Sequence, residues 1–260
     1  MKNCRTWGKA PYTVAVVHGG PGAAGEMALI AREISRSHGV IEPFQTERTL
    51  TLQETELEKI LMDRGDLPVI LIGHSWGAIL SFIVTAKNPA LVRKLILVSS
   101  GVFDDTYSAG IMKMRLNRLS QKDRITLDSL AAKLDDPNER EKNRIFAEFG
   151  NIIDTIDSQD PLIDTGEAIE YRYDIFENVW KQAQELRTSG ELVALGTHIH
   201  CPVVAIHGDY DSHPADGVKI PLSRVIKDFR FLPLENCGHR PWLERSAKNR
   251  FYEILNKELD

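Results

Sequence analysis

The chain has 260 residues, a length that permits one large α/β domain or such a domain with an insertion. Hydrophobic residues make up 42% and charged residues 27% of the sequence, the composition of an ordinary globular protein. The formal net charge of −5 argues against a nucleic-acid groove or an anionic membrane surface as the main partner. We therefore expect a small-molecule substrate, no nucleic acid and no membrane as partners. The sequence leaves the oligomeric state open.

The three cysteines, Cys4, Cys201 and Cys237, are widely spaced, and none belongs to a Cys-x-x-Cys motif. Such a sparse, odd-numbered set builds no disulfide framework and fits a reducing cytoplasm. Residues 1–11 lack the apolar core of a secretory signal, and no apolar run approaches the ~20 residues that span a bilayer. We therefore expect a cytoplasmic protein.

The first hundred residues alternate short apolar runs with segments of helical periodicity. Strands are predicted at residues 14–17, 39–44, 69–72 and 92–99, and helices at 26–38, 51–64 and 76–87. Apolar strands that alternate with helices are typical of a parallel sheet covered on both faces. The predicted fold class is therefore α/β, with a mostly parallel, doubly wound sheet.

The pattern changes after the strand at 92–99. Between residues 103 and 195 we find helical periodicity but no convincing buried strand, with helices predicted at 109–119, 138–157 and 171–187. The sheet resumes at 202–207, followed by a helix, a strand at 229–232 and a last amphipathic helix at 241–259. The predicted domains are a core of residues 1–102 and 196–260 and a helical cap of residues 103–195.

The pentapeptide Gly73-His74-Ser75-Trp76-Gly77 lies between a predicted strand and a predicted helix. Its two glycines allow the sharp turn that would project the hydroxyl of Ser75, and the following helix aims its N-terminal N–H groups at the same point. His74 is expected to pack beneath this turn. A serine hydroxyl is a poor nucleophile unless a base takes its proton and a third group orients that base.

Candidates for both partners follow later strands. Asp211 lies in the loop after the strand at 202–207, and His239 lies in the loop after the strand at 229–232. Ser75, Asp211 and His239 thus all follow the carboxyl ends of strands, where an open parallel sheet places its ligands. Asp209 is an alternative acid two residues away, and His239 could instead serve only as a cap for the last helix.

A metal site is a rival interpretation of the same region. It would draw on a dense group of ligand types, namely His198, His200, His207, Asp209, Asp211 and His213. The strand at 202–207 separates the first two histidines from the others. We therefore expect no metal and no other cofactor.

The motifs together resemble those of the α/β-hydrolases. His18-Gly19-Gly20-Pro21-Gly22 resembles the oxyanion loop of the proline-iminopeptidase-like serine hydrolases, and residues 73–77 resemble their nucleophile elbow. Gly208-x-x-Asp211 and Gly238-His239 resemble the acid and base loops, and residues 201–211 are also similar to small prokaryotic hydrolases. The resemblance covers residues 12–102 and 200–260. Family members usually begin with a β-hairpin that we expect to be missing here, leaving a sheet smaller by about two strands.

The resemblance implies a role for each matching residue. Ser75 would attack an acyl carbon, His239 would act as the base, and Asp211 would orient the imidazole. The backbone N–H groups of Gly20 and Trp76 would form the oxyanion hole. The implied activity is hydrolysis of a small ester, amide or thioester by an α/β-hydrolase of carboxylesterase type.

Two alternatives remain open at this stage. One is proline iminopeptidase activity, in which cap glutamates would bind the substrate amine; the candidates are Glu148, Glu167, Glu170 and Glu177. The other is a non-catalytic, ligand-binding member of the same fold. For the wall of the substrate pocket, we predict Phe103 and Trp180.

Overall fold

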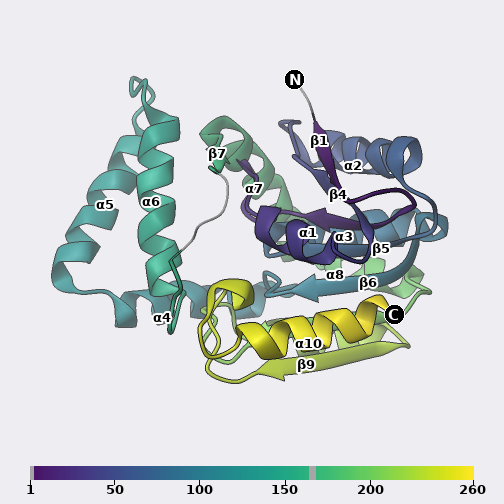
Figure 1. Cartoon of the computed structure of the whole chain (residues 1–260). Helices are drawn as coiled ribbons and strands as arrows, with labels where there is room; N and C mark the ends of the chain where they lie inside the picture. The colour runs from purple at the N-terminus through teal and green to yellow at the C-terminus, as the bar shows by residue number, and fades with distance from the viewer. Residues whose placement is uncertain (1–2, 164–167) are drawn as a thin grey trace.

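The computed structural model describes residues 3–163 and 168–260, and its centre is a seven-stranded sheet in the order β1-β4-β2-β5-β6-β8-β9 (Figure 1). The strands are β1 (Cys4–Trp7), β2 (Tyr12–Val17), β4 (Gly39–Pro43), β5 (Val69–His74), β6 (Val92–Val98), β8 (Val203–Gly208) and β9 (Phe229–Leu234). All neighbouring pairs are parallel except β1 and β4. The predicted α/β class with a mostly parallel sheet is confirmed.

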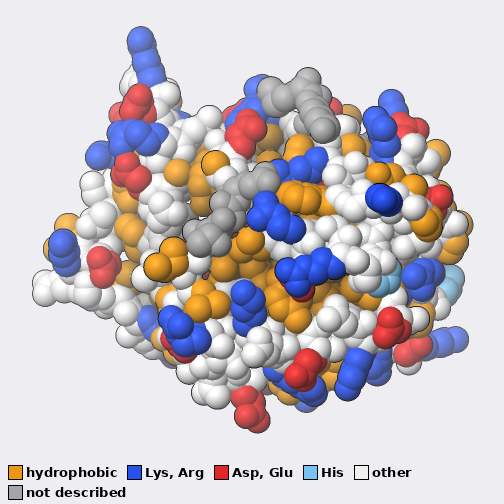
Figure 2. All heavy atoms as spheres, viewed as in Figure 1, with side chains coloured by type: hydrophobic (Ala, Val, Ile, Leu, Met, Phe, Trp, Pro, Cys, Tyr) orange, Lys and Arg blue, Asp and Glu red, His pale blue; other side chains and the backbone are white. Residues whose placement is uncertain are grey.

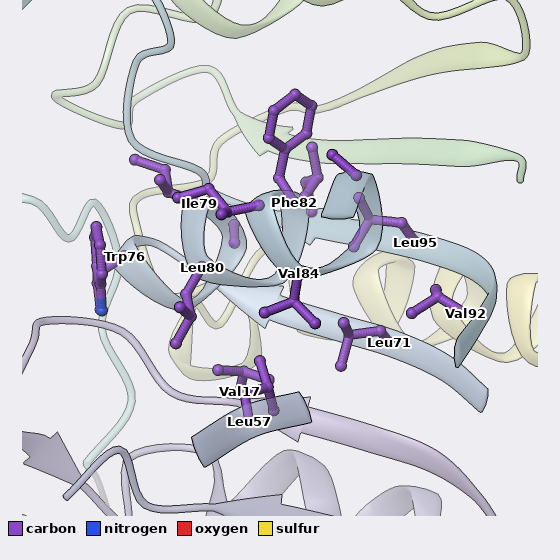
Figure 3. Close-up of a cluster of buried hydrophobic side chains, with 14 of the residues drawn as sticks. Val17, Leu57, Leu71, Trp76, Ile79, Leu80, Phe82, Val84, Val92 and Leu95 are labelled. Carbon is purple, nitrogen blue, oxygen red and sulfur yellow. The ribbon is translucent and has the colours of Figure 1, made fainter. Parts of the chain in front are cut away.

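Helices cover both faces of this sheet because its central strands are apolar on both sides. Val14 and Val16 of β2 face one layer, formed by α1 (Ala28–Ile34) and α10 (Lys248–Leu259). Ala15 and Val17 face the opposite layer, to which three helices contribute: α2 (Leu50–Arg64), α3 (Trp76–Lys87) and α9 (Asp216–Val225). Figure 3 shows the α3 side of this second layer, with Leu80 and Val84 directed toward Val17 and Leu71.

One strand of the sheet was not predicted. β1 precedes β2 in the chain but pairs with β4 in antiparallel register, with Cys4 opposite Pro43 and Trp7 opposite Val40. Because β4 lies between them, β1 and β2 form no hairpin with each other. Arg5 and Trp7 both donate hydrogen bonds to the buried carboxylate of Glu42, at 2.6 and 2.7 Å, which fixes β1 at the edge of the sheet.

The segment between β6 and β8 is helical, as expected. Its α-helices are α4 (Ser108–Arg118), α5 (Gln121–Asp135), α6 (Lys142–Ile156), α7 (Tyr173–Thr188) and α8 (Glu191–Ala194). The α5–α6 pair stands to one side of the sheet (Figure 1) and shares a small hydrophobic cluster with Tyr173 of α7. In contrast, Ile175, Val179 and Ala183 of α7 belong to the main core on the α3 side.

Short connections complete the chain. Residues 3–163 and 168–260 contain four 3-10 helices: η1 (Pro89–Leu91), η2 (Asp105–Tyr107), η3 (Leu195–His198) and η4 (Pro241–Leu243). A two-stranded sheet pairs β3 (Ala23–Ala24) with β7 (Glu170–Tyr171), which ties the loop after β2 to the inserted helical segment. Within the described residues, no helix combines the length and the apolar character needed to cross a membrane.

Candidate active site

Ser75 occupies a strained turn between β5 and α3. Its backbone has φ 53° and ψ −115°, a conformation that a non-glycine residue rarely adopts. Gly73 and Gly77 permit this turn because a Cβ on either would collide with backbone atoms, those of Gly77 and Ala78 in the first case and those of Val17 and His18 in the second. The turn leaves Ser75 half-buried at the carboxyl end of β5.

Asp211 and His239 are brought together from the loops after β8 and β9. The His239 Nδ1–H donates to Asp211 Oδ2 at 2.7 Å, and Asp211 is almost fully buried. Asp209, the alternative acid, is exposed and instead accepts the backbone N–H of Cys237 at 3.1 Å. Of the two aspartates, Asp211 is therefore the one in contact with the imidazole.

Ser75 and His239 line the same cavity, which has a volume of about 440 Å³. In the described part of the chain, the Ser75 hydroxyl forms no hydrogen bond with the imidazole. Hydrogen bonds of this kind are often long without substrate and shorten in the reacting complex. Because Nδ1 of His239 is occupied by Asp211, Nε2 is the ring nitrogen left for a partner in the cavity.

Electrostatics favour an ionised acid and a basic imidazole. Burial disfavours the charged form of Asp211, but the surrounding His239, His213 and His207 outweigh it and hold the pKa of this carboxyl well below its usual range. Burial likewise opposes the imidazolium of His239, yet the carboxylates of Asp211 and Asp157 prevail and raise the pKa of His239.

His213 is a second histidine bound to Asp211, a contact that was not predicted from the sequence. Its backbone N–H and its Nδ1–H both donate to Oδ1 of Asp211, at 2.8 and 2.9 Å, while Oδ2 is left to His239. Burial lowers the pKa of His213 to about 4 against the opposing pull of Asp211, so this ring is neutral near pH 7. The Asp-x-His spacing of residues 211–213 was the available signal.

The rival metal group is divided by the fold. His198 and His200 are exposed, before β8 begins. Asp211, His213 and His239 do place one potential ligand atom each within 4.8 Å of one another. In this cluster, however, both Nδ1 atoms are taken up by hydrogen bonds to the aspartate.

The two residues predicted to supply the oxyanion hole, Gly20 and Trp76, line the same cavity as Ser75. Gly20, with φ +33°, lies in the loop after β2, and Trp76 is the first residue of α3. Within the described ranges, neither N–H has a hydrogen-bond acceptor, whereas the N–H of Ser75 donates to Val98 O at 3.0 Å. The first N–H groups of a helix have no intrahelical acceptor. The N–H of Trp76, at the start of α3, is therefore available as a donor.

The rest of the cavity is largely apolar and comes from the segment between β6 and β8. The apolar lining residues from that segment are Ile111, Met112, Phe146, Phe149, Ile153, Ile169, Tyr171, Phe176 and Trp180. Trp180, predicted for the pocket wall, is one of these lining residues and stacks on Phe176 with ring centroids 5.9 Å apart. Phe103 lies elsewhere, fully buried in the core with its ring against Phe82 at 4.8 Å. Figure 2 shows hydrophobic side chains gathered between the α5–α6 pair and the sheet.

Of the four cap glutamates singled out from the sequence, the three that the structure describes do not line this cavity. Glu148, Glu170 and Glu177 are exposed, and the first two pair with Arg144 and Arg172. Glu167 lies outside the described residues.

Instead, three other carboxylates reach the cavity, and each has a basic side chain as its partner. Asp157 is bound by Arg115, with Nε 3.0 Å from Oδ1, and Asp154 lies 3.3 Å from Arg240. The third, Glu26, is paired with His74.

Comparison with known proteins identifies the fold family. A family model described as alpha/beta hydrolase fold matches residues 51–244, which is more than half of the chain. The chain belongs to the alpha/beta hydrolase fold family. Among solved structures, VinJ aligns with a TM-score of 0.67 and 20% identity over 98% of this α/β-hydrolase and 93% of that chain. A monoacylglycerol lipase from Paleococcus ferrophilus aligns with a TM-score of 0.63 and 12% identity, over 100% and 98% of the two chains.

A curated relative is similar over a shorter stretch. Monoglyceride lipase of Mus musculus is 31% identical over 80 residues, which is 31% of this α/β-hydrolase and 26% of the lipase. The matched stretch therefore spans about a quarter of that relative. None of these comparisons singles out the proline-iminopeptidase subgroup.

Proposed function

We propose that this α/β-hydrolase cleaves a small carboxylic ester, amide or thioester through an acyl-enzyme on Ser75. The observation that carries the proposal is the hydrogen bond between buried Asp211 and His239 at a cavity that Ser75 also lines. A neutral His239, held in one tautomer by Asp211, presents Nε2 as a base to that cavity.

The steps of the proposed reaction follow from these positions. Ser75 Oγ forms a bond to the acyl carbon while its proton passes to Nε2 of His239, and the carbonyl electrons move onto oxygen. The N–H groups of Gly20 and Trp76 stabilise that oxyanion. The bond to the leaving group then breaks, and the leaving group takes the proton from His239. Water next attacks the acyl carbon while His239 takes its proton. The bond to Ser75 Oγ then breaks, and Oγ takes that proton back.

Esters are favoured over N-terminal proline peptides by the charges in the cavity. An iminopeptidase requires an uncompensated carboxylate for the substrate amine, but Asp154 and Asp157 face Arg240 and Arg115, and Glu26 faces His74. The apolar lining suits an acyl chain. The lipase names of two of the compared proteins point to the same class of substrate.

The test is a substrate panel with the Ser75→Ala variant as control. We expect hydrolysis of p-nitrophenyl esters of graded chain length, loss of that activity in Ser75→Ala, and little release from proline p-nitroanilide. Release of p-nitroaniline without ester hydrolysis would favour the iminopeptidase alternative. Equal ester hydrolysis by wild type and Ser75→Ala would contradict the proposal.

A further inference from the structure

The side chain of His74, which precedes the proposed nucleophile, connects two other loops of the site. Its Nδ1 lies 3.0 Å from Glu26 Oε2, and its Nε2 lies 3.0 Å from the backbone oxygen of His239. The ring is 1% exposed and packs edge-on against Trp242, with centroids 4.7 Å apart. The expectation that His74 packs beneath the turn agrees with this placement, but these two contacts were not foreseen.

The hydrogen bonds of this pair can be assigned from the groups that each atom meets. A carbonyl oxygen can only accept, so Nε2 of His74 donates to His239 O. Glu26 Oε2 accepts the backbone N–H of Gly19 at 2.7 Å and lies 3.0 Å from Nδ1 of His74. Burial opposes ionisation of Glu26, but His74 outweighs it and, with help from Arg240, lowers the pKa of this carboxyl to about 2. Glu26 and His74 are therefore joined by a short buried hydrogen bond.

The pair lies where three loops of the site meet. Glu26 binds the loop that carries Gly20, His74 belongs to the turn that carries Ser75, and its ring holds the backbone of His239. Gly19 lies so close to the pair that a Cβ there would be 2.7 Å from Glu26 Oε2 and 2.8 Å from His74 Nδ1. No atom of the pair is needed to accept or donate the reacting proton, because those roles fall to Ser75 and His239.

We propose that Glu26 and His74 are positioning residues that hold the oxyanion loop and the base loop in register with the nucleophile turn. The proposal rests on the proposed function, because it assigns these residues to the same serine reaction. Loss of one oxyanion donor typically lowers turnover ~10²–10³-fold. Displacement of the Gly20 loop or of His239 would therefore lower kcat by about 10- to 100-fold. The apolar lining, which sets KM, would stay intact.

The test compares Glu26→Gln, His74→Asn and the double variant, with kcat expressed per molecule of enzyme that a fluorophosphonate labels. This normalisation corrects kcat for unfolded protein, whose amount would increase if the pair had a purely structural role. Glu33→Gln is the matched control, because Glu33 is a carboxylate on α1 that pairs with exposed Arg36, 2.7 Å away. Glu26→Asp tests rescue by a shorter carboxylate.

We expect each single variant to lose about 10- to 100-fold in kcat with KM changed less than about threefold. The double variant should be no slower than the slower single variant, Glu26→Asp should recover part of the rate, and Glu33→Gln should match wild type. Wild-type kcat per labelled Glu26→Gln enzyme, or losses that multiply in the double variant, would overturn the proposal. Failure of both single variants to fold would assign the pair to folding alone and overturn it as well. Absence of labelling at Ser75 in the wild type would instead refute the proposed function.

Discussion

The rings of His213 and His239 lie face to face, with centroids 4.6 Å apart, and each donates its Nδ1–H to a different oxygen of Asp211. One carboxylate thus serves two histidines. His213 has the lowered pKa and His239 the raised one, so the neutral ring acts as a fixed donor beside the ring that is proposed to change its charge.

Replacing His213 should change the basicity of His239. His213→Phe keeps a ring against His239 but removes one of the donors that disperse the charge of Asp211. A hydrogen bond to a charged group contributes about 1.5–3 kcal/mol. Without the His213 donor, Asp211 would stabilise the imidazolium of His239 more strongly, so the pKa of His239 would rise. We expect the acidic limb of the kcat/KM profile to move up by about half to one pH unit. A profile identical to that of the exposed control His200→Phe would contradict this role.

The pH dependence of the wild type follows from the raised pKa of His239. A protonated imidazole cannot accept the Ser75 proton, so kcat/KM should fall as the pH drops through the pKa of this residue. Because that pKa lies above the ordinary value of 6.5, half-maximal kcat/KM is expected above pH 6.5. Measurement on a neutral p-nitrophenyl ester avoids titration of the substrate, and a limb centred near pH 5 would contradict the assignment.

Gly19 should tolerate no side chain. The Cβ of Gly19→Ala would lie 2.7 Å from Glu26 Oε2 and 3.0 Å from Ser75 Cβ, so the loop or the turn has to move. We expect a lower Tm and at least a tenfold loss in kcat. Gly150→Ala is a control for stability, because its Cβ would lie 3.5 Å from the Tyr171 ring and alanine favours the helix. A Gly19→Ala variant with wild-type Tm and kcat would show that this contact is not tight.

Replacement of Trp180 should change KM, whereas replacement of Phe103 should change Tm. Trp180→Ala enlarges the cavity, so we expect KM to rise about tenfold for long-chain esters and little for acetate esters. Phe103→Leu removes ring atoms from the core, so Tm should fall while KM stays unchanged. A rise in KM for Phe103→Leu equal to that for Trp180→Ala would contradict the placement of the two residues.

Local patterns were sufficient to predict the parallel strands of the sheet. The apolar runs at β2, β5, β6 and β8 carry strong strand signals, and the predicted helices fall close to α2, α3 and α7. β1 was missed because its four residues, Cys-Arg-Thr-Trp, show no apolar run, and its pairing depends on Glu42 of a distant strand. α5 was also missed, although Ser120 and Asp123 form a capping pair at its start that the sequence displays.

The predicted last helix, 241–259, is interrupted for a tertiary reason. α10 begins only at Lys248, because Glu244 is buried and its carboxylate accepts the backbone N–H groups of Gln159, Asp160 and Gly238. No local propensity announces such long-range contacts.

For the site, motif spacing located Ser75, Asp211 and His239, since each follows a strand that the pattern reveals. The same spacing could not place Phe103, whose core position depends on how α3 crosses the sheet. Nor could it reveal the Glu26–His74 pair, because two residues 48 positions apart in the sequence give no sign of contact.

The role of Ser75 as the nucleophile is tested most directly by fluorophosphonate labelling of the wild type and Ser75→Ala, with the modified peptide identified by mass spectrometry. We expect one adduct per wild-type chain, on Ser75, and none on the variant. Equal labelling of both proteins, or an adduct on a different residue, would contradict it.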